Sequence, residues 1–154
     1  MNDEINESLD IDAPPAAVWA VVTDVRALPQ ILSGMTALAI EGDDPSMRVG
    51  LSWTQTRVIR GHTGSERLAV TAVEPGSKYA TEGGGHGFDY VTTWTVEPLG
   101  ADASRLTCTF RGIPRNWLAR VMLGIFSGAG SNASRNAMRA DLADIARAIE
   151  GGAR

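Results

Sequence analysis

The sequence predicts an α+β fold in which a curved, seven-stranded antiparallel sheet packs around one long C-terminal helix. Two patterns carry this prediction. Between residues 5 and 110, apolar and polar residues alternate in short segments at the spacing of antiparallel hairpins. In the last 40 residues, the apolar residues switch to helical spacing. The 154 residues contain no linker or internal repeat, so we expect a single domain over residues 1–154.

The chain is expected to open with one strand and two short helices. The strand is predicted over residues 5–11, whose apolar face also carries Glu7. Pro14-Pro15 then favours the first turn of a helix, where the missing N–H of proline costs nothing, and this helix ends near Asp24. A second short helix is expected over residues 26–32.

Six further strands complete the predicted sheet. They are expected at residues 36–41, 47–59, 68–72, 79–82, 88–96 and 106–110. Segments rich in glycine, proline and aspartate separate most of them. Among these segments, residues 61–64 are predicted to form a turn, and the glycine-rich stretch at 83–87 to form a loop.

The last element is predicted to be an amphipathic helix of about five turns that ends at Gly151-Gly152. Its apolar stripe consists of Met138, Leu142, Ile145 and Ile149. Charged residues, including Asp141 and Asp144, fall on its other faces. Residues 117–126 also have a helical pattern. The glycines between 124 and 130 predict a kink or a break before the second helical piece.

Composition narrows the possible functions. A net charge of −4 argues against general nucleic-acid binding, which usually needs a basic surface. The single cysteine, Cys108, excludes an internal disulfide and a cysteine-based zinc site, and we expect neither metal nor cofactor. No apolar run approaches the ~18–20 residues that cross a bilayer, and the N-terminus is acidic rather than signal-like. We therefore expect a cytoplasmic protein without membrane insertion, either a monomer or a homodimer.

Several short motifs, in order and at similar spacing, resemble the START-like or SRPBCC superfamily. The resemblance covers essentially the whole chain. The matching residues are Ile11-Asp12-Ala13-Pro14-Pro15, Val18-Trp19, Asp24, Val49-Gly50, Glu74-Pro75 and Asp141-Leu142.

This resemblance implies a Bet v 1-like helix-grip fold, in which the sheet holds the long helix over a hydrophobic cavity. Members bind lipids, sterols, polyketides and other apolar ligands. Many bacterial members are described as polyketide cyclases or dehydrases. The resemblance implies a cavity without specifying its ligand, and the superfamily has no shared catalytic motif to carry over.

Strand alternation indicates which side chains face that cavity. If Val49, Leu51 and Trp53 point inward, then Gln55 and Arg57 do too. For Arg57 and Glu7 we favour a position that reaches water, because unpaired burial of charge is costly. The predicted ligand-binding residues are Trp53, Gln55, Arg57, Leu68, Val70, Phe88, Tyr90, Thr92, Trp94, Cys108, Phe110, Met122, Phe126 and Met138.

Three functional hypotheses remain open at this point. The favoured one is a binding module for a hydrophobic small molecule such as a lipid, polyketide or aromatic compound. The second is a cyclase, aromatase or dehydratase, with His86 as base and Arg57 and Tyr90 as hydrogen-bond donors. The third is a protein-interaction module, which requires an exposed apolar patch. Cys108 is expected to be a small buried hydrophobe rather than a nucleophile.

Overall fold

The computed structural model describes residues 4–59, 61–85 and 88–152, without the side chains of residues 119–120, 122–131 and 152. A seven-stranded antiparallel sheet has the strand order β1-β7-β6-β5-β4-β3-β2. In chain order, the elements are β1 (Glu4–Ile11), α1 (Pro15–Val22), the 3-10 turn η1 (Val25–Ala27), α2 (Leu28–Ile31), β2 (Met35–Ile40), β3 (Ser52–Ile59), β4 (His62–Glu74), β5 (Lys78–Gly85), β6 (Phe88–Pro98), β7 (Ser104–Pro114) and α3 (Trp117–Gly152).

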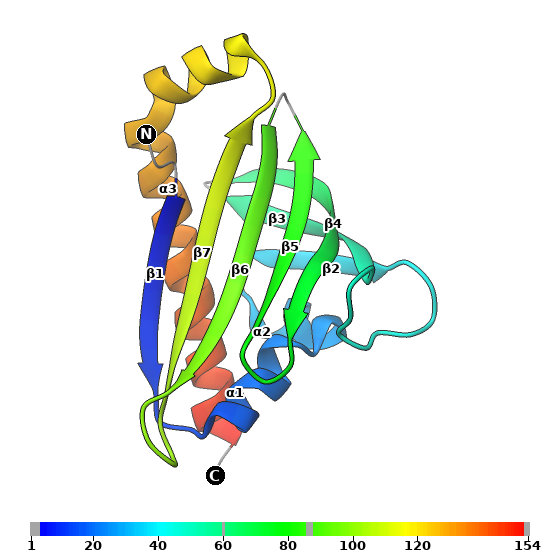
Figure 1. The fold of residues 1–154 in the computed structure, drawn as a ribbon, viewed down its shortest axis with the longest axis vertical. Coiled ribbons are helices and arrows are strands. Elements are labelled where there is room, and N and C mark those ends of the chain that lie inside the picture. The colour runs from blue at the N-terminus through cyan, green and yellow to red at the C-terminus, as the bar shows by residue number, and fades with distance from the viewer. Residues whose placement is uncertain (1–3, 60, 86–87, 153–154) are drawn as a thin grey trace.

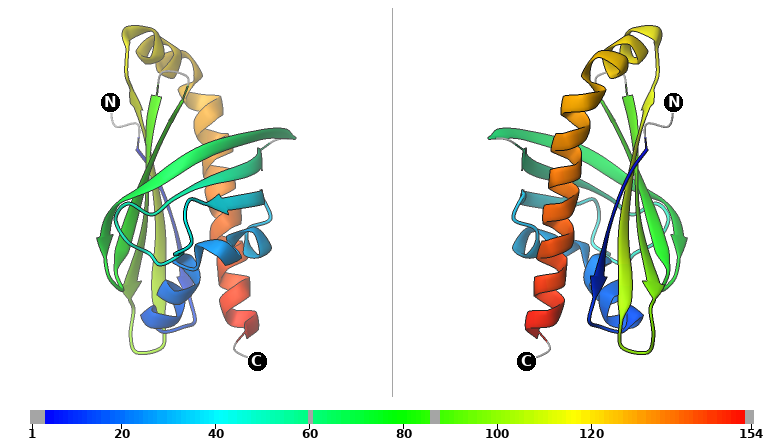
Figure 2. Two further views of the ribbon diagram at one scale, coloured as in Figure 1. Left: turned by 90° about the vertical axis from the view of Figure 1, so that its right-hand side faces the viewer. Right: turned by 90° about the vertical axis from the view of Figure 1, so that its left-hand side faces the viewer.

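The sheet curls around α3, as the two side views make clear (Figure 2). Helix α3 runs along the sheet beside β1 and β7, while β2, β3 and β4 wrap toward its other side (Figures 1 and 2). Helices α1 and α2 lie near the C-terminal half of α3 and cover that end of the fold. This arrangement confirms the predicted α+β class and the helix-grip architecture.

The main core lies between the inner face of the sheet, α1 and the second half of α3. The predicted apolar stripe of α3 is confirmed, since Leu142 and Ile145 are almost fully buried. They join Val18 of α1 and Leu106 of β7 in one cluster. Each such side chain contributes roughly 1.5–3 kcal/mol by its removal from water, so this cluster fixes α3 against the sheet.

The predicted loop at residues 83–87 is wrong for its described part. Gly83, Gly84 and Gly85 continue β5 and pair with residues 90, 89 and 88 of β6, respectively. A Cβ atom at Gly83 would lie 2.6 Å from Cδ2 of Leu68 and 3.0 Å from the carbonyl oxygen of Arg67. The absence of a side chain at Gly83 therefore allows β5 to lie close against β4.

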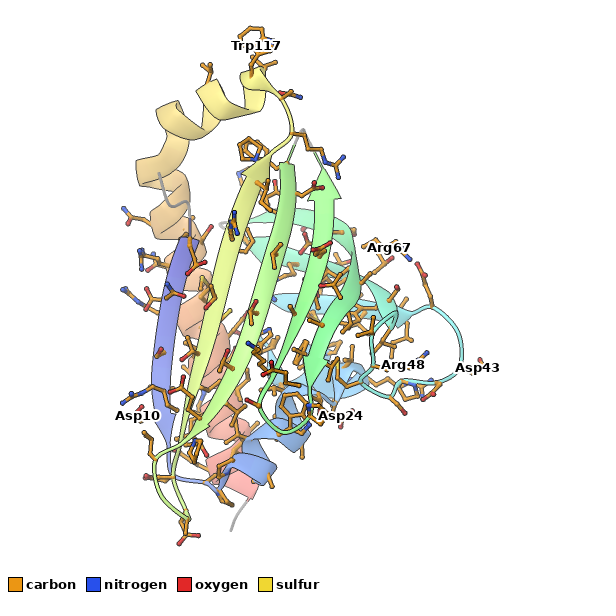
Figure 3. The ribbon with its side chains drawn as sticks, in the orientation of Figure 1. Asp10, Asp24, Asp43, Arg48, Arg67 and Trp117 are labelled. Carbon is orange, nitrogen blue, oxygen red and sulfur yellow. The ribbon has the colours of Figure 1, made fainter. Side chains whose placement is uncertain are left out.

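Two other strand boundaries also differ from the prediction. The predicted turn at 61–64 is shorter, because β4 already begins at His62. The predicted strand at 47–59 begins only at Ser52, and Val49 is 63% exposed rather than inward-facing. The segment before Ser52 forms a loop that contains Asp43 and Arg48 (Figure 3). Gly50 adopts a φ of 96°, which favours glycine and interrupts the extended chain.

The predicted interruption of the C-terminal helix is a bend rather than a break. Helix α3 is continuous from Trp117 to Gly152, but its first turns run at an angle to the remainder (Figure 1). The glycines between residues 124 and 130 account for the bend, because a helix bends more easily at glycine.

Candidate functional site

A cavity of about 630 Å³ lies between the inner face of the sheet and α3. Its apolar and aromatic wall comes from α1, α2 and six of the strands together with α3. The exposed surface of the wall is mostly apolar, but eleven of its 23 lining residues carry a polar group. They are Gln55, Arg57, Ser65, Glu66, Thr81, Thr92, Ser134 and Asp141, together with the hydroxyls of Tyr79 and Tyr90 and the thiol of Cys108.

Most of the predicted cavity residues do line this space. They are Trp53, Gln55, Arg57, Leu68, Tyr90, Thr92, Trp94, Cys108 and Phe110. Three others do not. Val70 is buried in the main core, Met138 packs with Ile5 and Cys108, and Phe88 stacks on Tyr90. The side chains of Met122 and Phe126, and the whole of His86, lie outside the described residues.

Stacked rings form an aromatic wall on β6 and β7. The rings of Tyr90 and Phe110 have centroids 5.6 Å apart and an interplanar angle of 23°, and Phe88 stacks on Tyr90 at 6.1 Å. Burial raises the pKa of the Tyr90 phenol, and the negative charge of Glu66 raises it further. The phenol is therefore protonated at neutral pH and can donate a hydrogen bond inside the cavity.

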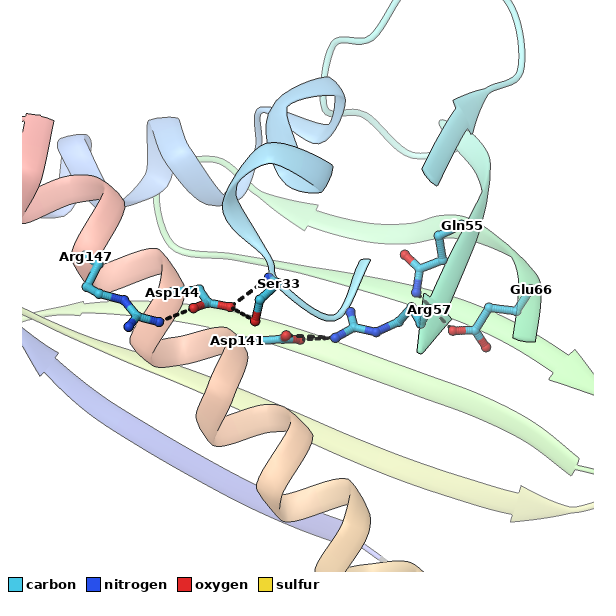
Figure 4. A network of polar contacts seen from close by, with 7 residues as sticks. All are labelled: Ser33, Gln55, Arg57, Glu66, Asp141, Asp144 and Arg147. Atoms are coloured by element: carbon cyan, nitrogen blue, oxygen red, sulfur yellow. Dashed lines mark hydrogen bonds and ion pairs between the residues drawn. The ribbon is translucent and has the colours of Figure 1, made fainter. Parts of the chain in front are cut away.

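An ion pair between Arg57 of β3 and Asp141 of α3 crosses the interior (Figure 4). Nη2 of Arg57 donates to both carboxylate oxygens of Asp141, at 2.7 and 2.9 Å. The two side chains are only 17% and 11% exposed, so the expectation that Arg57 reaches water is wrong. The alternation predicted for this strand was correct, since it turns Arg57 inward. The burial of its charge is offset by Asp141 of α3, which lies 84 residues away in the sequence.

The environment of Asp141 shifts its proton affinity. Burial raises the pKa of the Asp141 carboxyl above its ordinary value, and the adjacent Arg57 guanidinium opposes that rise. Gly34 packs against the same guanidinium, since a Cβ there would lie 3.3 Å from Nη2 of Arg57.

One helical turn further along α3, Asp144 fixes the segment that precedes β2. The backbone N–H and the hydroxyl of Ser33 both donate to Oδ2 of Asp144 at 2.8 Å, and Arg147 pairs with Oδ1 (Figure 4). Burial acts to raise the pKa of Asp144, but these hydrogen bonds outweigh it and lower the pKa. Asp141 and Asp144 are both buried, so part of the predicted polar side of α3 faces protein.

A second polar chain runs along β3 and β4 on the cavity wall. Nε1 of Trp53 donates to Oε1 of Gln55 at 3.1 Å. Nε2 of Gln55 in turn donates to Oε1 of Glu66 at 3.0 Å. Glu66 and Asp141 were not among the predicted site residues. Their spacing could have indicated that both face the interior. Glu66 shares a strand face with Leu68, and Asp141 lies one helical turn from both Met138 and Ile145.

Glu7, on the inner face of β1, is also paired rather than solvated. Arg135 and Arg139 of α3 bind its two carboxylate oxygens at 3.0 and 3.1 Å, and its side chain is 13% exposed. The hydrogen bond from Arg139 is the main cause of a lowered pKa at Glu7. This pairing joins β1 to α3, and it replaces the expected position in solvent.

Cys108 is the small buried residue that the sequence indicated. It is 3% exposed, and burial raises the pKa of its thiol far above the ordinary value. Such a thiol stays protonated at neutral pH, and protonated thiols are poor nucleophiles.

The surface contains the exposed apolar residues that the third hypothesis requires. Trp117, Leu118 and Val121, in the first turns of α3, are 75%, 55% and 48% exposed. Trp117 lies at one tip of the molecule (Figure 3). Within the described residues, no helix is long and apolar enough to span a bilayer.

Comparison with known proteins gives one family and a set of structural relatives. The family described as polyketide cyclase / dehydrase and lipid transport matches residues 3–150. No curated protein matches the sequence. Among solved structures, TTHA0849 from Thermus thermophilus is 15% identical with a TM-score of 0.79, over 98% of this chain and 99% of that one.

Two further solved structures are similar to this chain, and both are named as enzymes. Truncated norcoclaurine synthase from Thalictrum flavum is 17% identical with a TM-score of 0.74, over 97% of this chain and 94% of that one. The Zhui aromatase/cyclase from Streptomyces sp. R1128 is also 17% identical, with a TM-score of 0.69 over 95% and 94%. At such identities the likeness shows a shared fold alone. The family match, over residues 3–150, shows that the chain belongs to the polyketide cyclase / dehydrase and lipid transport family.

Proposed function

We propose that the protein binds a hydrophobic, ring-containing small molecule, such as an aromatic compound, a polyketide or a lipid, in the cavity between the sheet and α3. The cavity itself carries the proposal. Protein interiors are close-packed and contain few voids larger than a water molecule. A space of about 630 Å³ corresponds to roughly 20 water molecules at ~30 Å³ each. It falls within the ~300–1,000 Å³ of small-molecule sites.

The composition of the wall supports an apolar, ring-containing ligand. Aromatic side chains of Trp53, Tyr90, Trp94 and Phe110 line the space, and most of the exposed wall is apolar. This combination is the usual one for small-molecule sites, where apolar contacts give affinity and a few polar groups fix orientation.

The test is to incubate the purified protein with a cell extract and identify the bound compound by native mass spectrometry. Thr92→Phe is expected to abolish binding, because it adds a ring inside the cavity. Its matched control is Thr93→Phe, whose side chain points to the other face of β6. A single co-purifying apolar compound that is lost only in Thr92→Phe supports the proposal. An empty protein, with no thermal shift across lipids and aromatic polyketides, contradicts it, as does equal binding by both variants.

A second candidate function is cyclisation or dehydration of a polyketide in the same cavity. Two of the three residues predicted for it, Arg57 and Tyr90, line the cavity. The predicted base, His86, lies outside the described residues. It would take a proton from the carbon next to one carbonyl, that carbon would attack a second carbonyl, and the resulting alkoxide would take the proton back. Loss of this hydroxyl together with a second proton from the neighbouring carbon would then release water. Tyr90 would stabilise the developing oxyanion as a donor. The test is ring formation and loss of water from a poly-ketone thioester, followed by mass spectrometry, which Tyr90→Phe should slow without preventing binding.

A further inference from the structure

We propose that Glu66 anchors the polar end of the ligand, so that the cavity selects aromatic compounds that carry a hydrogen-bond donor and rejects those that carry a carboxylate. The shared chemistry of the selected group is an N–H or O–H donor, as in a protonated amine or a phenol. This inference rests on the proposed binding function and specifies its ligand class.

The balance of charge on the cavity wall is the first argument. Among the described residues that line the cavity, only three carry a full charge: Arg57, Glu66 and Asp141. The guanidinium of Arg57 is held by both oxygens of Asp141, so these two charges compensate each other. The carboxylate of Glu66 remains and gives this part of the wall a net negative charge.

The orientation of Glu66 is the second argument. Glu66 lies directly opposite Gln55 in the pairing of β3 with β4. The indole N–H of Trp53 occupies the carbonyl oxygen of the Gln55 amide, so the amide NH₂ must face Glu66. This contact holds Oε1 of Glu66. No other described side chain donates to this carboxylate, so Oε2 is free to accept a hydrogen bond from a ligand.

The position of the aromatic wall is the third argument. The charge of Glu66 acts on the phenol of Tyr90, so the carboxylate lies within electrostatic reach of that ring. Tyr90 stacks with Phe110, and both rings line the cavity. A ligand ring held against this wall would present its substituent to Glu66.

The chemistry of these groups determines the selectivity. A ligand N–H or O–H donating to Glu66 forms a charge-assisted hydrogen bond, which is roughly twice as strong as a neutral one. A ligand carboxylate would instead meet a like charge in a partly water-excluded space. We expect the difference in Kd between the two ligand types to be at least about tenfold.

Four naphthalene compounds that differ in one substituent test the inference. They are naphthylmethylamine, naphthol, methylnaphthalene and naphthoate. Their Kd values would be measured by isothermal titration calorimetry at neutral pH. The amine and naphthol should bind at least about tenfold more tightly than naphthoate. A comparison of the Kd values of the amine and naphthol shows whether the site prefers a cation or a neutral hydrogen-bond donor.

The decisive variant is Glu66→Gln, which keeps the size of the side chain and removes its charge. It should bring the Kd values of the amine and naphthoate to within about threefold of each other. Glu82→Gln is the matched control, because Glu82 is exposed on β5 and does not line the cavity. The control should keep the ranking of the wild type, and thermal unfolding checks that both variants are folded.

The outcomes separate this inference from the function on which it rests. Binding of methylnaphthalene tests the apolar cavity alone. If it binds, but all four compounds have equal affinity or Glu66→Gln keeps the ranking, the role of Glu66 is refuted and the binding function stands. If none of the four compounds binds, the selectivity assigned to Glu66 is refuted, while the binding function is decided separately by the compound that co-purifies from the cell extract.

Discussion

Replacing Arg57 by methionine would leave the carboxylate of Asp141 buried without its partner. Methionine keeps much of the volume and the apolar contacts of the arginine stem, so the lost charge dominates the effect. Removing one member of a buried ion pair typically costs 3–5 kcal/mol. Because the side chains are 17% and 11% exposed, we expect the low end of that range, about 3 kcal/mol. For a domain of this size, that lowers Tm by roughly 6–12 °C.

The pH dependence gives a second, independent readout. The pKa of Asp141 is already raised by burial, and loss of Arg57 raises it further. The folded variant then binds a proton more readily than the unfolded chain does. Its deficit in the free energy of unfolding relative to the wild type should therefore shrink as pH falls through this raised pKa.

Urea unfolding followed by circular dichroism, at neutral and mildly acidic pH, measures both effects. Arg57→Met combined with Asp141→Leu should recover most of the lost stability, because no charge then remains buried. Arg67→Met is the control, since Arg67 makes a comparable pair with Glu41 on the surface, and its effect should be much smaller. A loss below about 1 kcal/mol, or a double variant as unstable as the single one, would refute this reasoning.

Three further predictions concern β5 and the cavity wall. Gly83→Ala should lower the free energy of unfolding by about 1–3 kcal/mol in urea titrations, because the added Cβ would lie 2.6 Å from Cδ2 of Leu68. Gly64→Ala is the control and should be nearly neutral, because a Cβ there would meet open space. Cys108 should react with a thiol reagent far more slowly in the folded protein than in urea, since burial raises its pKa; equal rates would contradict its burial. Glu66→Gln should lower the pKa of Tyr90 in an ultraviolet titration, because a negative charge near the phenol is removed; an unchanged pKa would place Glu66 out of reach.

Local patterns predicted the elements whose residues repeat at a regular period. The alternation along β7 and the apolar stripe of α3 are both confirmed, because burial of one face imposes that period on the sequence. The inward direction of Gln55 and Arg57 also followed from strand period. The predictions at residues 61–64 and, within the described residues, at 83–85 were wrong, because glycine favours loops locally, whereas here Gly83 allows two strands to pack closely.

The partners of the charged residues could not be predicted from local patterns. Glu7 lies on the inner face of β1, yet Arg139, one of its partners, is 132 residues away. The sequence marks Glu7 as a residue out of place without indicating what compensates it. The same holds for Asp144, which the helical pattern assigns to a polar face and which the fold buries against Ser33.

The sequence by itself determined the class of fold, the family and the apolar, aromatic character of the inner wall. These properties depend on spacing along the chain, which periodic burial imposes on each element separately. The tertiary structure alone decided that Arg57 is neutralised by Asp141, that Glu66 faces the cavity beside Gln55, and that a space of about 630 Å³ stays open. Those outcomes depend on how strongly the sheet curves and where α3 crosses it, and both are set by the packing of all elements together.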